Sequence, residues 1–246
     1  MDREKVIEVK NLVKKFGSFT ANDNLTFDVY KGEIFGFLGA NGAGKTTAMK
    51  ILCGLSKPSS GDIRIVGYDV YHETERIKNS IGYMSQKFSL YDDLTVWENF
   101  RFFGGIYGLS RKEIESQTQL LLNRLGIWSY KDRIISSIPL GWKQKLAFSV
   151  AIMHRPAIVF LDEPTGGVDP VTRRQFWDLI YQAASEGYTV FVTTHYMDEA
   201  EYCDRVSIMV DGRIRALDTP ENLKSTFDCQ DMQDVFIKLA REAKYQ

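Results

Sequence analysis

A glycine-rich run in the first part of the chain has the spacing of a phosphate-binding loop. The letters GANGAGKT satisfy the pattern G-x-x-x-x-G-K-[ST] and lie between a predicted strand at residues 34–38 and a predicted helix at residues 46–55, as such a loop requires. The run consists of Gly39, Ala40, Asn41, Gly42, Ala43, Gly44, Lys45 and Thr46. Its glycines follow the order G-x-x-G-x-G, so the G-x-G-x-x-G pattern of dinucleotide-binding loops is a poor fit.

The chemistry expected of this loop is triphosphate binding. Glycines let backbone N–H groups converge on phosphate oxygens at a helix N-terminus. The Lys45 ammonium can then reach the β- and γ-phosphates, and the Thr46 hydroxyl can bind Mg²⁺. The run therefore predicts a site for a nucleoside triphosphate with Mg²⁺, and the other interpretation is a glycine turn without a ligand.

Two adjacent carboxylates supply further groups for the same chemistry. Residues 158–164 read IVFLDEP, an apolar strand that ends in Asp162 and Glu163. Open α/β sheets bind ligands at the carboxyl ends of their strands. Asp162 can hold Mg²⁺ through its water shell, and Glu163 can orient or deprotonate the attacking water. Alone, the pair would more often be a solvated strand end, but the phosphate-binding loop favours a catalytic role.

Gln86 and His195 each follow a further predicted strand, at residues 81–85 and 189–194. The second strand delivers His195 to the same edge of the sheet, where an imidazole can bond the γ-phosphate and sense its loss. Taken singly, Gln86 also fits a solvated amide and His195 a satisfied polar group.

The elements that position these groups have an α/β pattern, in which short β-rich runs alternate with helices and favour a largely parallel sheet. One more strand is predicted at residues 206–210, followed by Asp211-Gly212, a hairpin signal into residues 213–217. Between about residues 90 and 155 apolar residues fall at helical spacing, which predicts an inserted helical subdomain. A C-terminal helical tail is predicted at about residues 220–246.

The composition is that of an ordinary globular domain. Hydrophobic residues make up 44% and charged residues 26% of the chain, and the net charge is −1, so no nucleic-acid partner is expected. The N-terminal letters MDREKVIEVK do not resemble a signal peptide, and no run approaches the ~18 apolar residues of a membrane span. We therefore expect the chain to stay in the cytoplasm.

The set and order of these segments resemble the nucleotide-binding domain of ABC transporters over essentially the whole chain. The resemblance implies a single ABC ATPase domain over residues 1–246, with a P-loop NTPase (RecA-like) parallel-sheet core, an antiparallel β portion and the inserted helices. It makes residues 39–46 the Walker A loop, with Thr47 as a further nucleotide contact. Asp162 and Glu163 become the Walker B pair, Gln86 a catalytic and Mg²⁺-contacting glutamine, and His195 the catalytic switch histidine.

Two more nucleotide contacts rest on this resemblance. Phe16, in the letters KKFG, matches the A-loop aromatic position that stacks on adenine. Residues 167–169 match the D-loop, which gives Asp169 a place at the nucleotide.

The signature loop departs from the family pattern. Where the family usually shows LSGGQ, residues 138–142 read IPLGW, so that Pro139 and Leu140 replace serine and glycine while Gly141 is retained as a nucleotide contact. In the family this loop faces the γ-phosphate of the ATP bound by the partner subunit. Because proline lacks a hydroxyl and an N–H, we expect an isolated homodimer to close weakly around ATP. Either a partner chain with a full signature then supplies the active site, or the altered loop has another geometry in which Leu140 packs and the remaining N–H groups suffice.

The resembled family implies ATP hydrolysis that drives transport across a membrane. Two subunits, identical or different, bind ATP and Mg²⁺, close, hydrolyse ATP and reopen, and so move an integral-membrane permease from its cytoplasmic face. The letters KPSSGDI and DEPTGGVDP look most like the drug- and polymer-export branch, which predicts an exporter. The alternative is an ABC ATPase that acts without a permease.

The permease contact is expected among aromatic residues that follow Gln86, although each of them also fits the core of the helical insertion. These residues are Phe88, Tyr91, Trp97, Phe100, Phe102, Phe103 and Tyr107.

Overall fold

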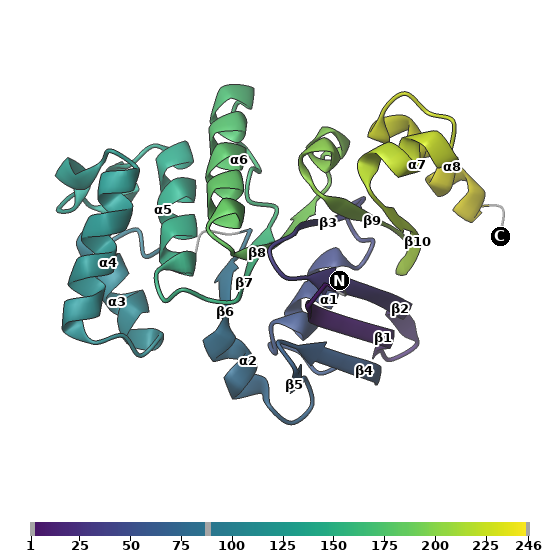
Figure 1. The fold of residues 1–246 in the computed structure, drawn as a ribbon, viewed down its shortest axis with the longest axis horizontal. Helices are drawn as coiled ribbons and strands as arrows, with labels where there is room; N and C mark the ends of the chain where they lie inside the picture. The colour runs from purple at the N-terminus through teal and green to yellow at the C-terminus, as the bar shows by residue number, and fades with distance from the viewer. Residues whose placement is uncertain (1–2, 87–89, 245–246) are drawn as a thin grey trace.

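A six-stranded sheet forms the centre of the molecule in a computed structural model, which describes residues 3–86 and 90–244. Its strands are β3 (Ile34–Gly39), β6 (Ile81–Met84), β7 (Ile158–Asp162), β8 (Thr189–Thr194), β9 (Arg205–Val210) and β10 (Arg213–Asp218). The spatial order is β10-β9-β3-β8-β7-β6, and every neighbouring pair is parallel except β9 and β10 (Figure 1). Strands β3, β7 and β8 are buried along their whole length, as expected of parallel strands covered on both faces. Their carboxyl ends therefore meet at one edge.

A second, antiparallel sheet packs beside the first. It consists of β1 (Lys5–Phe16), β2 (Phe19–Tyr30), β4 (Ser60–Ile65) and β5 (Tyr68–Asp69), in the order β2-β1-β4-β5. The helix α2 (Thr74–Ser80) leads from it back to β6. Aromatic rings fill the space between the sheets, with Phe27 of β2 stacked on Phe35 at 5.7 Å between centroids and Phe37 lying 5.4 Å from Phe191. The helix α1 (Lys45–Leu52) buries Met49, Ile51 and Leu52 in this same core.

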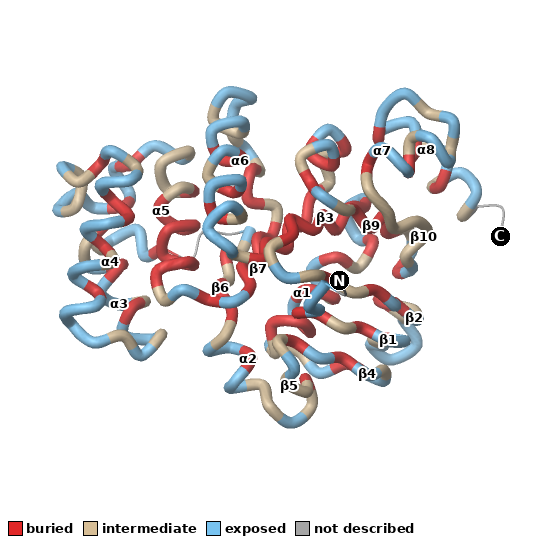
Figure 2. Tube along the Cα trace, in the orientation of Figure 1, coloured by how far each residue is buried: buried red, intermediate tan, exposed pale blue. Residues whose placement is uncertain are grey.

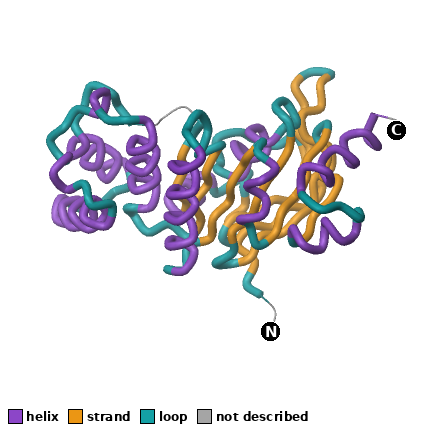
Figure 3. Tube along the Cα trace, turned by 90° about the horizontal axis from the view of Figure 1, so that it is seen from above, coloured by secondary structure: helices purple, strands orange, loops and turns teal. Residues whose placement is uncertain are grey.

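Helices gather at the opposite end of the molecule. They are α3 (Val96–Ile106), α4 (Arg111–Arg124), the 3₁₀ helices η1 (Trp128–Tyr130) and η2 (Ile135–Ser137), and α5 (Leu140–Ile152). Figures 1 and 3 show them as a group beside the strands. Capping boxes begin α3 at Thr95 and Glu98 and α4 at Ser110 and Glu113. These helices lie within the segment predicted as a helical insertion.

The remaining helices cover the sheet and follow its last strands. The helix α6 (Pro170–Ser185) begins after β7, and the 3₁₀ helix η3 (Met197–Tyr202) follows β8. The chain ends in α7 (Pro220–Thr226) and α8 (Met232–Lys244), which lie at the end of the molecule opposite the helical insertion (Figure 1). Val235 and Leu239 of α8 are buried. Figure 2 shows buried residues concentrated in the sheets and on the inward faces of the helices.

The predicted α/β class is confirmed, and each strand placed from the sequence is present. The hairpin at Asp211 and Gly212 is also confirmed, with both residues at positive φ, 48° and 77°. The predicted helix at residues 46–55 is shorter, because Gly54 at φ 67° ends α1 after Leu52. Among the described residues, no helix is both long enough and apolar enough to span a membrane.

Candidate nucleotide-binding and catalytic site

The loop between β3 and α1 packs closely against the backbone of other segments of the chain. A Cβ atom on Gly39 would lie 2.6 Å from the Met209 carbonyl oxygen, and one on Gly44 would lie 2.3 Å from that of Ala21. Gly44 also has a φ of 99°, which an L side chain rarely adopts. These positions therefore need glycine on steric grounds.

The first turn of α1 directs free N–H groups into this loop. Gly44 precedes the helix and has no side chain that could cap it, and the first intrahelical bond runs from Ala48 N to Gly44 O at 3.0 Å. The N–H groups of Lys45, Thr46 and Thr47 precede that bond, so they are available to a ligand. Together with the helix dipole they suit an anion.

Lys45 lies across its own loop. Its Nζ donates to the carbonyl oxygens of Gly39 at 2.7 Å and Ala40 at 3.2 Å, and it lies 3.5 Å from Glu163 Oε1. Burial lowers the pKa of Lys45, and the charge of Glu163 partly offsets that shift. The lysine is thus held beside the carboxylate in a position from which it can move to phosphate oxygens.

Asp162 and Thr46 supply oxygen atoms next to the loop. The Thr46 hydroxyl donates to Asp162 Oδ1 at 3.4 Å, and the Thr193 hydroxyl donates to the same oxygen at 2.6 Å. Burial raises the pKa of Asp162, while the hydrogen bond from Thr193 lowers it. A hydroxyl and a carboxylate are ligands that suit Mg²⁺, so this donor set fits the predicted metal.

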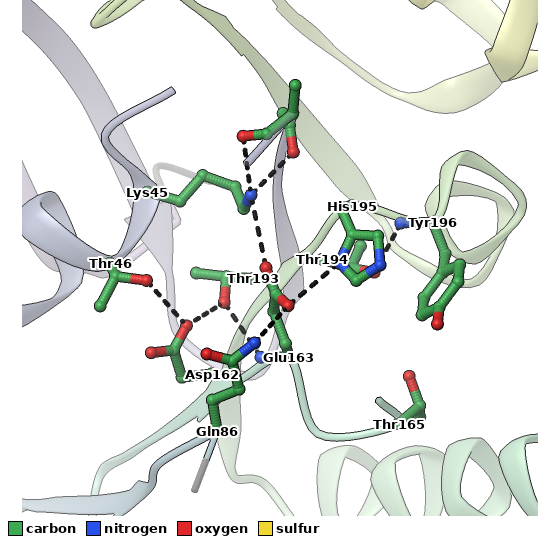
Figure 4. A network of polar contacts seen from close by, with 12 residues as sticks. Lys45, Thr46, Gln86, Asp162, Glu163, Thr165, Thr193, Thr194, His195 and Tyr196 are labelled. Carbon is green, nitrogen blue, oxygen red and sulfur yellow. Dashed lines mark hydrogen bonds and ion pairs between the residues drawn. The ribbon is translucent and has the colours of Figure 1, made fainter. Parts of the chain in front are cut away.

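Glu163 is the point at which the predicted catalytic residues meet (Figure 4). Its side chain is 8% exposed, and its Oε2 accepts a hydrogen bond from Gln86 Nε2 at 2.9 Å. His195 Nδ1 lies 3.0 Å from the same oxygen, although it lacks the alignment of a hydrogen bond. Glu163 has a φ of 48°, and its N–H donates to the carbonyl and hydroxyl oxygens of Thr193, both at 3.1 Å. Thr193 on the neighbouring strand β8 thus anchors the strained backbone of Glu163, and this backbone directs the Glu163 carboxylate toward Lys45.

A hollow of about 410 Å³ lies over the loop. Its lining includes the predicted residues Asn41, Gly42, Gly44, Lys45, Thr46, Thr47, Gln86 and Glu163, together with Ala21 and Phe19. Phe16 does not line it. Phe16 is exposed at the tip of the β1–β2 hairpin, with Lys14 Nζ 4.9 Å from its ring centroid, and Phe19 is its partner across the hairpin.

Gly141 and Asp169 lie elsewhere, in a second hollow of about 550 Å³ that shares no lining residue with the first. Asp169 caps α6, and its Oδ1 accepts bonds from Val171 N and Thr172 N, both at 3.0 Å. A hydrogen bond from the Thr172 hydroxyl is the main cause that lowers the pKa of Asp169. Thr172 also packs against Gly141, where an added Cβ would lie 2.4 Å from Thr172 Cγ2. The residues predicted as the signature loop and the D-loop thus form one surface, separate from the phosphate loop of the same chain.

The sequence interpretation missed residues that support the site. Besides Phe19, these are Thr193, which anchors both Asp162 and Glu163, and Gln144 of α5, whose Nε2 donates to the Gly166 carbonyl at 3.2 Å. Only the position of Thr193 could have indicated its role, because it lies near the end of the strand predicted at residues 189–194, two residues before His195.

The fold and this site define a P-loop NTPase domain, and comparison with known proteins narrows the class. Residues 22–166 match the model of the ABC transporter family. The probable multidrug ABC transporter ATP-binding protein YbhF of Escherichia coli is 47% identical over 97% of this chain and 42% of its own length. The linearmycin resistance ATP-binding protein LnrL of Bacillus subtilis is 36% identical over 89% of this chain and 71% of its own length.

Solved structures agree with this assignment. An ATP-binding subunit of an ABC transporter superposes with a TM-score of 0.85 at 29% identity, over 95% of this chain and 99% of that one. A dimeric ATP-binding cassette bound to ADP and phosphate superposes with a TM-score of 0.77 at 25% identity, over 87% of this chain and 98% of that one. The chain belongs to the ABC transporter family and carries its ATPase domain. It spans less than half the length of the Escherichia coli relative.

Proposed function

We propose that this chain binds and hydrolyses ATP to drive export across a membrane, as a motor at the cytoplasmic face of a permease. The observation that carries the proposal is the position of Glu163. Its carboxylate lies 3.5 Å from Lys45 Nζ and within 3.0 Å of both Gln86 Nε2 and His195 Nδ1, directly beside a loop suited to phosphate.

ATP binding would use the loop and the start of α1. The N–H groups of Lys45, Thr46 and Thr47 would donate hydrogen bonds to the phosphate oxygens, and the Lys45 ammonium would exchange the carbonyls of Gly39 and Ala40 for the β- and γ-phosphates. Thr46 and Asp162 would hold Mg²⁺ with its water shell. Held by these two residues, Mg²⁺ would neutralise negative charge on the phosphates.

Hydrolysis would use the carboxylate of Glu163, which orients the attacking water or accepts its proton. Gln86 fixes one oxygen of that carboxylate, and His195 lies beside the same oxygen, where it can bond the γ-phosphate. Thr193 holds Asp162 and the backbone of Glu163 together, so the metal ligand and the water-directing group keep a fixed relation.

Relatives support the exporter and the pairing of two cassettes. The names of YbhF and LnrL refer to a multidrug transporter and to linearmycin resistance, and the proposed direction of export follows these names. The solved dimer with ADP and phosphate supports a second ATPase subunit, identical or different, as partner. The signature and D-loop hollow, which contains Gly141 and Asp169, is the surface we assign to that partner.

The permease contact is proposed at the outward part of the aromatic cluster. Tyr91 and Phe102 are exposed and contact each other at 4.9 Å, and Phe103 lies 5.3 Å from Phe102. Phe100 is instead fully buried, and Tyr107 stacks on His154 at 3.7 Å. Phe88 lies outside the described residues.

Phe102→Glu tests the docking proposal. Phe102 is 42% exposed, so a charge there should leave the fold intact but remove the stimulation of ATPase activity by the permease. Leu120→Glu on α4, at a side chain that is 46% exposed, is the matched control and should keep that stimulation. If the permease still stimulates the ATPase activity of Phe102→Glu, the permease contacts another surface of the chain. Purification of the chain from native cells without any membrane protein would favour the alternative, an ABC ATPase that acts without a permease.

A further inference from the structure

A fully buried carboxylate lies next to the catalytic residues but outside the motifs. Glu199, in η3, has 0% exposure. Its Oε1 accepts a short hydrogen bond from the Thr165 hydroxyl, and its Oε2 accepts another from the Thr194 hydroxyl. Both threonines are buried as well. A buried carboxylate with two hydroxyl donors is a strong tether, because the loss of either donor leaves polar groups unpaired away from water.

The segments that Glu199 joins are those that carry the catalytic side chains. Thr165 follows Glu163 by two residues, in the loop that leads to Asp169, and Thr194 directly precedes His195. In Figure 4 Thr194 is drawn at the His195 ring, and Thr165 lies lower in the view. Thr194 also accepts a hydrogen bond from Tyr196 N at 3.0 Å, so its hydroxyl fixes the turn that holds His195. One carboxylate therefore spans the loop after Glu163 and the loop that contains His195.

Arg173 of α6 completes this arrangement. Its Nε lies 3.7 Å from Glu199 Oε1, and its guanidinium carbon lies 4.0 Å from the centroid of the Tyr196 ring. The Tyr196 ring in turn lies 4.2 Å from the ring of His195. The Arg173 guanidinium offsets the buried negative charge of Glu199. It also packs the loop that contains His195 against α6, the helix that Asp169 caps.

We propose that Glu199 is a positioning residue for ATP hydrolysis, which fixes the distance between Glu163 and His195 through Thr165 and Thr194. The inference rests on the proposed function. The positive φ of Glu163 makes the direction of its carboxylate depend on the backbone that flanks it. Thr193 anchors that backbone on the strand side, and Thr165 with Glu199 anchors it on the loop side.

The test is a set of purified variants of the full chain. Thr165→Val removes the hydroxyl at nearly constant shape, and Thr165→Ser restores it. Glu199→Gln keeps the length of the side chain but removes its charge. Glu33→Gln is the matched control, since Glu33 is also a buried glutamate, at 4% exposure, but it bonds Tyr30 N and Arg205 at the start of β3, the end of the strand away from the phosphate loop.

Steady-state kinetics should distinguish a positioning role of Glu199 in hydrolysis from a contribution to the stability of the fold alone. We expect Thr165→Val and Glu199→Gln to lower kcat at least about tenfold with KM for ATP nearly unchanged, because a small misplacement of a catalytic group slows chemistry while the phosphate loop is intact. Thr165→Ser should return kcat to near the wild-type value. Glu33→Gln should lower the melting temperature and leave kcat unchanged.

Two further measurements tie the effect to His195. In a His195→Ala background, Thr165→Val should add little to the loss of kcat, because residues that act as a unit are not additive. Hydrogen exchange should become faster in residues 163–167 and 194–197 of Thr165→Val but not of Glu33→Gln. If the wild-type chain is active and Thr165→Val has the same kcat, the inference on Glu199 is refuted while the proposed function stands. The same holds if the effect of Thr165→Val is fully additive with that of His195→Ala. A wild-type chain without ATPase activity would refute the proposed function and this inference with it.

Discussion

Restoration of the family signature should tighten the ATP-dependent pairing of two chains. The helix α5 begins at Leu140, and the Pro139 carbonyl accepts its first bonds, from Trp142 N at 3.0 Å and Lys143 N at 3.1 Å. Pro139 contributes neither an N–H nor a hydroxyl, so this turn offers a phosphate chiefly the N–H groups of Leu140 and Gly141. The double variant Pro139→Ser plus Leu140→Gly adds a hydroxyl and an N–H at position 139.

The expected gain in the free energy of dimerisation follows from the hydrogen-bond donors that the double variant adds. Each charge-assisted hydrogen bond to phosphate is worth ~1.5 kcal/mol or more, which corresponds to about tenfold in an equilibrium constant. Leu140 is 40% exposed, so its removal loses little burial, and glycine in a helix costs at most ~1 kcal/mol. Two such bonds less the cost of glycine leave a gain of ~2 kcal/mol, so we expect half-maximal dimerisation at an ATP concentration about thirtyfold lower for the double variant.

The assay is sedimentation of the chain against ATP concentration, in a Glu163→Gln background that prevents hydrolysis. Pro139→Ala is the matched control, because it restores the N–H without the hydroxyl and should give an intermediate shift. Unchanged or weaker dimerisation of the double variant would contradict the donor count. It would mean that the native loop at residues 138–142 already grips the phosphate.

Three further predictions concern binding and stability. Lys45→Ala should abolish tight ATP binding in a titration, since it removes the side chain that reaches the phosphates; unchanged affinity would contradict this. Burial lowers the pKa of His154 to about 4, so the folded chain holds this imidazole neutral while the unfolded chain protonates it near pH 6.5. Stability from His154 is therefore complete above pH 6.5 and should fall by up to about 3 kcal/mol as the pH drops to about 4, and denaturant titrations of His154→Gln should lack this loss. Gly82→Ala should cost about 1–3 kcal/mol of unfolding free energy in the same assay, because its Cβ would lie 2.1 Å from the Ala151 carbonyl oxygen; wild-type stability would show that α5 can shift.

The parallel sheet and the phosphate loop could be predicted because their signals are local. Continuous apolar runs identify buried parallel strands, and the ends of those runs place Asp162, Glu163 and His195 at one edge. The antiparallel strands could not be placed one by one. Strand β1 contains several register shifts against β2, and Asn11 and Asn24 have positive φ, so the alternation of apolar and polar residues is broken.

The supporting contacts of the site depend on segments that are distant in sequence. The letters MDEAEY give no sign that Glu199 is buried, since its burial requires Thr165, 34 residues earlier, to approach it. The hydrogen bond from Gln144 to Gly166 and the place of Phe19 over the phosphate loop likewise arise only from tertiary packing. Sequence spacing predicts which groups can react, whereas these long-range contacts fix their orientation.

The role of the Glu163 carboxylate is tested most directly by the rate of phosphate release from Mg·ATP by the wild-type chain and by Glu163→Gln. If the Glu163 carboxylate prepares the attacking water, the variant should bind ATP as the wild type does but hydrolyse it at least about 100-fold more slowly, which corresponds to ~3 kcal/mol. Near-normal turnover in Glu163→Gln would contradict this role, because it would mean that a group other than the carboxylate bonded by Gln86 carries out the chemistry.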